Sequence, residues 1–241
     1  MGLDLYVGPL TRYHLGDWLT ITQQIGAQEG YDVRVVRAHE EEDGETDPDM
    51  VHGAVREWQQ WLGEALGGPV DWPDGPSQPY WTDKPDWDGF GAVLLLAAYD
   101  ERPDLCPSPW DRKGPWDRKD SPREFADAPA YQAASAQPER FLSLLSGVEW
   151  WLPLAADPLV FEASRPTGEP VRMASVERLV AELRLLDERA GVLAGHDPAE
   201  LRRGLFTDDP SLADVARFGF AVLLDLAETA LQHRQPLLLD Y

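Results

Sequence analysis

The stretch DPSLADVARFGFAVLLDLAETALQH (residues 209–233) decides the fold class, because it predicts the longest helix of the chain. Its opening Asp-Pro pair is typical of a helix N-terminus, and apolar residues then recur at helical spacing. Phe218, Phe220 and Leu224 widen this apolar stripe until the middle turns are apolar on nearly every side. A helix of that kind is buried, so we expect it to lie at the centre of the domain with the other elements around it.

The sequence predicts four or five strands to accompany this helix. Gly2–Val7 alternates apolar and polar residues, as a strand with one buried face does. Tyr31–Arg37 is rich in valine and predicts a second strand, which we expect to pair with the first. Leu159–Ala163 and Pro170–Ala174 flank a turn with proline and glycine and predict a hairpin, and Leu237–Leu239 predicts a closing strand.

Further helices are predicted from capping residues and apolar stripes. A helix capped by Asp17 is expected to end near Gln28. The next helix starts at Asp47 and ends before two glycines, and the spacing of its apolar residues places both Trp58 and Trp61 in the core. Shorter helices are expected at residues 139–146, from Ser175 to about 190, and after Asp197.

Two stretches of the chain have no clear period. The apolar run Ala92–Ala98 fits either a buried strand or a buried helix, and its alanines together with Asp86 as a cap favour a helix. Residues 102–137 form the least regular stretch, and PWDRK occurs there twice, at 109–113 and 115–119. A loop this long within a domain is usually functional or disordered.

Taken together, these elements predict a single compact α+β domain that spans residues 1–241. The six or seven helices do not alternate regularly with the strands, so we expect a small antiparallel or mixed sheet packed against helices, with long loops rich in tryptophan and proline. No Gly/Ser linker divides the chain.

The charge of the chain limits its partners. Lys and Arg total 21 against 43 Asp and Glu, which gives a net charge of −22. Such a chain repels nucleic acid and anionic membranes at long range and attracts a basic protein. The alternative is that the charge serves solubility only, as in many acidic, lysine-poor bacterial proteins.

Three features indicate a soluble cytoplasmic protein. The single cysteine, Cys106, cannot form an internal disulfide, which suits a reducing compartment. The first residues lack the basic segment of a secretory signal. The longest apolar runs are far shorter than the roughly 20 residues that span a bilayer.

The sequence lacks the motifs of several enzyme classes, which favours a non-enzymatic protein without cofactor or metal. GxGxxG, GxxxxGK[ST], GxSxG, HExxH and CxxC are all absent. Nucleotide-binding loops, serine hydrolases of the elbow type and zinc ribbons are therefore disfavoured. Glycosidase chemistry needs only two placed carboxylates and stays open.

Our first hypothesis is a protein-binding module that holds a basic partner on an acidic face with tryptophan anchors, as an immunity or antitoxin-like protein would. The loop 39–47 is dense in carboxylates but lacks the residue order of a calcium loop. Tryptophans in irregular segments suit an interface, although they can also pin long loops to the body. The expected partner-binding residues are Glu40, Glu41, Glu42, Asp43, Trp72, Trp81, Trp110 and Trp116.

The main alternative is an enzyme with its site beside the first strand. Asp4, His14 and Asp17 would serve a metal-dependent hydrolase, with Arg12 as an anion contact. The opposing interpretation is that Asp17 caps a helix, Arg12 is paired and His14 lies on the surface. A third hypothesis is a carbohydrate-binding module that uses the tryptophan loops.

Overall fold

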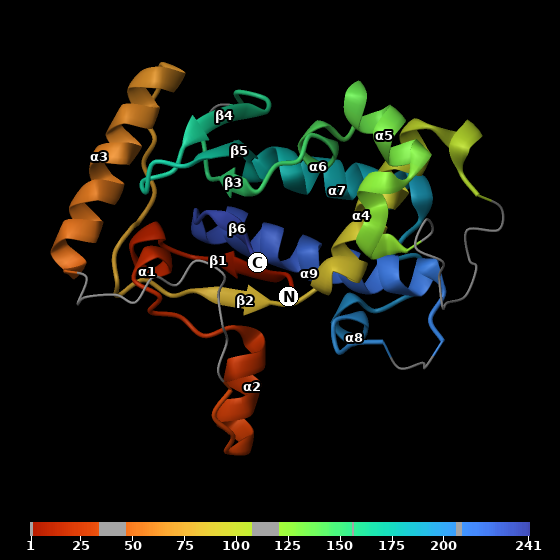
Figure 1. The fold of residues 1–241 in the computed structure, drawn as a ribbon, viewed down its shortest axis with the longest axis horizontal. Coiled ribbons are helices and arrows are strands. Elements are labelled where there is room, and N and C mark those ends of the chain that lie inside the picture. Colours follow the sequence, from red (N-terminus) through yellow and green to blue (C-terminus); the bar gives the residue numbers. More distant parts are fainter. Residues whose placement is uncertain (1, 34–46, 108–120, 156, 206–208) are drawn as a thin grey trace.

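The computed structural model describes residues 2–33, 47–107, 121–155, 157–205 and 209–241, and the strands in them form one six-stranded sheet (Figure 1). Its order is β2-β1-β6-β3-β5-β4, in which β3 and β5 are parallel and the other neighbours are antiparallel. The strands are β1 (Asp4–Val7), β2 (Trp81–Asp83), β3 (Trp150–Leu152), β4 (Phe161–Ser164), β5 (Pro170–Ser175) and β6 (Leu237–Asp240).

Nine α-helices lie in the described part of the chain, and together with the mixed sheet they confirm the α+β class. The sheet has six strands where four or five were expected, and the helices outnumber the six or seven expected. The apolar run Ala92–Ala98 is helical, as its alanines predict. The helices are α1 (Leu10–His14), α2 (Ile21–Glu29), α3 (Pro48–Leu66), α4 (Asp86–Glu101), α5 (Pro129–Ala136), α6 (Leu142–Leu145), α7 (Val176–Ala190), α8 (Pro198–Leu201) and α9 (Leu212–His233), with 3-10 helices at Pro103–Leu105 and Pro122–Asp127.

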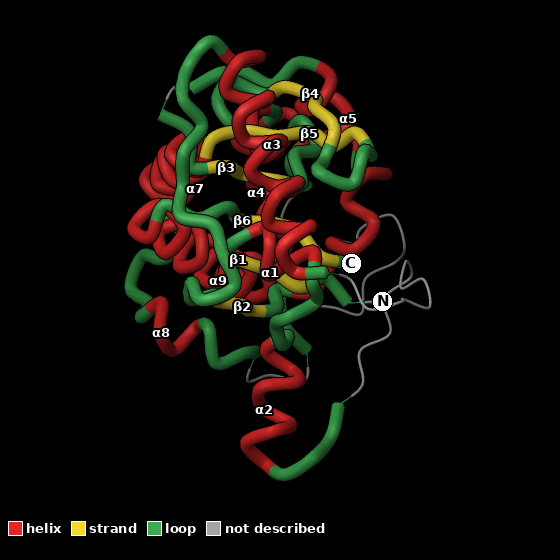
Figure 2. The backbone as a smooth tube through the Cα atoms, turned by 90° about the vertical axis from the view of Figure 1, so that its left-hand side faces the viewer, coloured by secondary structure: helices red, strands yellow, loops and turns green. Residues whose placement is uncertain are grey.

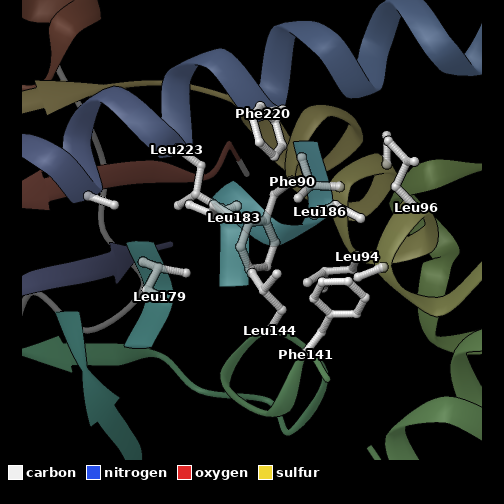
Figure 3. Packing of buried hydrophobic residues seen from close by; sticks show 14 of the residues in the cluster. Phe90, Leu94, Leu96, Phe141, Leu144, Leu179, Leu183, Leu186, Phe220 and Leu223 are labelled. Carbon is white, nitrogen blue, oxygen red and sulfur yellow. The ribbon is translucent and has the colours of Figure 1, made fainter. Parts of the chain in front are cut away.

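One face of the sheet packs against α4, α7 and α9 (Figure 1). Alternate side chains of β1 and β6, such as Leu5 and Leu239, point into this core, because successive residues of a strand face opposite sides. Figure 3 shows side chains from α4, α6, α7 and α9 meeting there, among them Phe90 and Phe220. The predicted central helix, α9, therefore does form the middle of the core.

The opposite face of the sheet is covered by α1, α3 and the loop 69–80. Tyr6 and Trp150 face this side, where Trp58 of α3 packs between sheet and loop. The Trp58 ring centroid lies 6.2 Å from that of Trp72 in the loop and 6.2 Å from that of Trp150. α3 thus buries one side only and leaves its other side on the outside of the molecule (Figure 2).

Two glycines let α4 and α9 come into backbone contact. A methyl group on Gly219 of α9 would lie 2.7 Å from the Cα of Gly89 of α4, and nearer still to its carbonyl oxygen. Side-chain carbons do not approach backbone atoms so closely, so residue 219 has to be glycine for this helix pair to form.

The strand expected at Tyr31–Arg37 is not found in its described part. Residues 31–33 are not in a strand, and residues 34–37 lie outside the described residues. β1 pairs instead with β2 and β6, which come from distant parts of the chain. Neither β2 nor β3 is indicated by the sequence, because three residues are too few to show an alternating pattern.

Several helix starts also differ from expectation. Thr20 caps α2 in place of Asp17, and Ser211 caps α9 in place of Asp209, each through a capping box with a side chain three residues later. Asp86 is the first residue of α4 and not its cap. The expected caps at Asp47, Ser175 and Asp197 are confirmed.

Candidate functional site

Arg12 of α1 and Asp17, which follows that helix, are two of the residues expected in an enzyme site, and they pair with each other. Arg12 Nε lies 3.3 Å from an Asp17 carboxylate oxygen. Its Nη1 donates to the carbonyl of Gln78 at 3.1 Å, and its guanidinium lies 4.4 Å from the centre of the Tyr80 ring. These contacts hold the chain before β2 against α1, which agrees with the interpretation of Arg12 as a structural, paired residue.

His14 is half-buried and packs against the aromatic core. Its ring centroid is 5.4 Å from that of Tyr13 and 6.2 Å from that of Trp150. Its Nε2 is buried and has no hydrogen-bond partner within the described ranges. Burial, and next the nearby Arg165 guanidinium, lower the pKa of His14 from 6.5 to about 4, so the ring is neutral at pH 7.

This half-buried histidine makes the stability of the fold depend on pH. Because the folded pKa lies below the unfolded value, the folded state binds fewer protons, so His14 stabilises fully above pH 6.5 and less as the pH falls toward about 4. Between about pH 7.5 and about pH 4.5, His14 alone should lower the free energy of unfolding by about 2.5 kcal/mol. When urea unfolding is measured at both pH values, the free energy of unfolding of His14→Gln should fall between them by about 2.5 kcal/mol less than that of the wild type. His196→Gln, which changes an exposed histidine, should match the wild type, and equal losses in all three proteins would contradict this role.

Asp4, the fourth residue expected in an enzyme site, lies in β1. It is paired across β1 and β6 with Asp240, so the two carboxylates share one side of the sheet. The hydroxyl of Tyr13 donates to Asp240 at 3.0 Å. The four expected residues thus divide between the Arg12–Asp17 pair at the end of α1, His14 against the aromatic cluster, and Asp4 in the sheet.

A polar cluster that the sequence did not indicate joins α1, α3 and the loop 69–80. The buried carboxylate of Asp74 accepts from the main-chain N–H of Thr11 at 3.2 Å and from the Thr11 hydroxyl. His52 Nδ1 lies 3.2 Å from that hydroxyl and 3.4 Å from the carboxylate. The cluster fastens α3 to α1. Since Thr11 is fully buried, its hydroxyl is not accessible as a nucleophile.

Within residues 2–33, 47–107, 121–155, 157–205 and 209–241, no three His, Cys, Asp or Glu side chains are grouped so that they could hold a metal ion.

Of the tryptophans expected to bind a partner, the two that the structure describes are engaged internally. Trp72 is 3% exposed and packs on Trp58. Trp81 is half-buried, and its ring centroid lies 4.3 Å from that of His233. Trp72 pins the loop 69–80 to the body, the alternative that the sequence left open, whereas Trp81 lies in β2 and not in a loop. The remaining expected residues, Glu40, Glu41, Glu42, Asp43, Trp110 and Trp116, lie outside the described residues.

Exposed apolar side chains lie instead on α2, α3 and the residues next to them, and we call these residues, 17–33 and 47–64, the α2–α3 region. Trp61 is 46% exposed and Met50 is 71% exposed, so the expectation that Trp61 is a core residue is wrong. Seven carboxylates and one arginine fall in the same residues. The other exposed large apolar residues of the region are Leu19, Ile25 and Tyr31.

α2 projects from the rest of the molecule in both views (Figures 1 and 2). Its attachment is at the first turn, where the Leu19 N–H donates to the Tyr80 hydroxyl at 3.1 Å and the Gln24 amide donates to Thr82 at 3.0 Å. Ile25, one turn further, is 49% exposed. The helix therefore presents apolar surface that this chain does not cover in its described part.

α3 ends at a surface hollow of about 390 Å³, which we call the α3 hollow. Gly67 closes the helix in the left-handed conformation, with a φ of 72°. The amide of Gln60 donates to the Glu64 carboxylate at 3.2 Å at its rim. The lining residues are Gln59, Gln60, Gly63, Glu64, Gly67, Gly68, Pro69 and Val70.

Comparison with known proteins gives no relative for this chain: no protein-family model, no curated protein and no solved structure matches it. Among the helices of the described residues, none has the length and apolar character needed to cross a membrane.

Proposed function

We propose that the protein is a protein-binding module that holds a basic protein partner on its α2–α3 region, in the manner of an immunity or antitoxin-like protein. The supporting observation is that exposed apolar side chains coincide there with an excess of carboxylates. We propose the cytoplasm as its compartment, on the basis of the single cysteine.

Carboxylates and exposed apolar side chains would contribute differently to such a complex. Carboxylates attract a basic partner from a distance and speed association, and they disfavour acidic partners. Exposed aromatic and aliphatic side chains supply the buried area that slows dissociation, and tryptophan is prominent among the residues that dominate interface energies. Trp61 and Ile25 are the anchors that this division of roles selects.

The other hypotheses have less support from particular contacts. For a hydrolase beside the first strand, Arg12 and Asp17 already pair with each other, and the His14 ring packs against the rings of Tyr13 and Trp150. For a carbohydrate module in the tryptophan loops, Trp72 is buried. Both remain predictions from sequence without a favouring geometry.

Capture from native cells with substituted baits tests the proposal. The wild-type protein, used at about 0.15 M salt, should retain a basic protein in stoichiometric amount and should lose most of it at about 1 M salt. A double variant, Ile25→Ser with Trp61→Ser, should retain at least about tenfold less, which corresponds to ~1.4 kcal/mol. Both positions are exposed, so the folded state should change little in stability.

Leu231→Ser is the matched control, because Leu231 is exposed on α9, outside the α2–α3 region. This variant should capture as much partner as the wild type. Equal capture by the double variant, or a captured partner that is acidic, would contradict the proposal. So would a wild-type bait that captures nothing.

A further inference from the structure

α3 carries a second row of side chains beside the row that it buries. Val55, Trp58 and Leu62 are buried, whereas a line of five exposed residues runs along another side of the same helix. At about 100° per residue, these five positions fall within an arc of roughly 80° and therefore share one side. We call them the outer row of α3: Met50, Ala54, Glu57, Trp61 and Glu64.

The outer row has the spacing of a surface that pairs with another helix. Its members are four, three, four and three residues apart, which is the alternation that coiled coils repeat. Such a row drifts slowly around its helix, by about 20° in seven residues, so a second helix can follow it at a shallow crossing angle. From residue 50 to residue 64 the row offers about four turns of contact.

The apolar members of the row are open to contact from outside. α3 lies at the edge of the molecule in Figure 1, and there Met50 is 71% exposed and Trp61 is 46% exposed. Ala54, one turn after Met50, is small and also exposed, so another helix could approach closely at that point. Methionine adapts its shape to a partner, and tryptophan often dominates interface energies.

The charges of the row disfavour a second copy of this chain as its occupant. Glu57 and Glu64 belong to the row, and no ion pair among the described residues involves either of them. Arg56, the one arginine of α3, falls about 100° or more away around the helix. A second copy would bring the same carboxylates and a net charge of −22 against the row, whereas a basic helix would complement it.

We propose that the outer row of α3 packs lengthwise against an amphipathic helix of the basic partner. Apolar residues of that helix cover Met50, Ala54 and Trp61, and its lysine or arginine residues face Glu57 and Glu64. The two glutamates are seven residues apart, so the partner's basic residues should recur at about the same interval. An extended segment does not keep this spacing, because its side chains alternate every second residue. The inference rests on the proposed function and adds to it the partner's secondary structure and the helix that receives it.

Titration with a synthetic helix tests this inference. The probe is an amphipathic peptide of about 21 residues, with leucines along one face and two lysines seven residues apart on that face. In protein labelled with nitrogen-15 tryptophan, the indole N–H signal of Trp61, assigned with Trp61→Phe, should shift saturably. A scrambled peptide of equal composition, which has no apolar face, should not shift it. An unmoved Trp61 signal at about 1 mM of the lysine peptide would overturn the inference.

Charge reversal produces a gain of binding that a misfolded variant cannot imitate. The double variant Glu57→Lys with Glu64→Lys should bind the lysine peptide about tenfold more weakly and should bind a peptide with glutamates in place of the two lysines. The matched control, Glu177→Lys with Glu188→Lys, reverses two exposed carboxylates of α7 and should leave both affinities as in the wild type. Equal effects of the two double variants would mean that only net charge matters, and would contradict the proposed contact.

Ala54 tests whether the helices approach closely. Ala54→Gln adds a long neutral side chain in the outer row and should raise the dissociation constant of the lysine peptide at least about fivefold. Ala27→Gln makes the same change at an exposed position of α2 and should leave it unchanged. Wild-type affinity in Ala54→Gln would show that the peptide does not lie along the row.

These results can be separated from failure of the proposed function. If the lysine peptide leaves Trp61 unmoved while the Ile25 and Trp61 variant still loses a basic partner in the capture experiment, the docking proposal stands and the helix inference falls. If the peptide binds the outer row as expected while the wild type captures no partner from cells, the helix-binding surface stands and the proposed function falls.

Discussion

Gly219→Ala is expected to destabilise the folded protein by at least about 4 kcal/mol, and so to lower Tm by roughly 10 °C. The added methyl group would overlap the carbonyl group and the Cα of Gly89, and backbone cannot move aside as a flexible side chain can. α4 and α9 would have to separate, and the core between them would lose its packing. Thermal and urea unfolding followed by circular dichroism measure the loss.

Gly53→Ala provides the control of opposite sign. Gly53 lies within α3, and no atom lies within 4 Å of the position that its Cβ would take. Alanine there should stabilise the protein by about 0.5–1 kcal/mol, because it lowers the conformational entropy of the unfolded chain. Wild-type stability in Gly219→Ala would show that α4 and α9 are not in contact.

Glu182→Leu is expected to cost about 4 kcal/mol, because Glu182 holds a buried turn together. Its carboxylate accepts from the Ser143 N–H and hydroxyl, both at 3.0 Å, and from the Leu144 N–H at 3.1 Å. Leucine would leave these donors buried and unpaired. The substitution removes the bonds that fix α6 to α7, and urea unfolding should show the full loss.

The pKa of Glu182 is raised by burial, although the hydrogen bonds from Ser143 and Leu144 oppose that rise. Glu182→Gln keeps one acceptor oxygen, so it should lower the free energy of unfolding by less than Glu182→Leu does. Glu188→Leu, at an exposed position of the same helix, should change stability by no more than about 0.5 kcal/mol. Similar losses at 182 and 188 would mean that the turn does not depend on the buried carboxylate.

Elements with many residues and a clear period could be predicted from the sequence. α3 begins and ends at the expected residues because Asp47 and Gly67 provide local signals for both. β2 and β3 could not be predicted, since each has three residues and is defined by pairing with strands far away in the chain. Sheet order depends on such pairings, which no local pattern encodes.

Less of the candidate site could be predicted from the sequence. The helical spacing of the α3 stripe predicts Trp61 in the core, yet the buried residues of α3 are Val55, Trp58 and Leu62. A residue at the edge of a stripe can lie on either side, and tertiary packing decides which. The cluster of Thr11, His52 and Asp74 joins positions 41 and 63 residues apart, so only the fold brings them together.

The pairing of β1 with β6 has a consequence for how the chain acquires its structure. Strands at residues 4–7 and 237–240 are neighbours in the middle of the sheet, so that centre cannot form until residues 237–240 have left the ribosome. Closing a loop of this length carries a large entropic cost before any contact repays it, and proteins dominated by such distant contacts fold slowly. Until residue 240 is made, β1 has an open edge on that side. We therefore expect this protein to need protection from aggregation during synthesis more than its final stability would suggest.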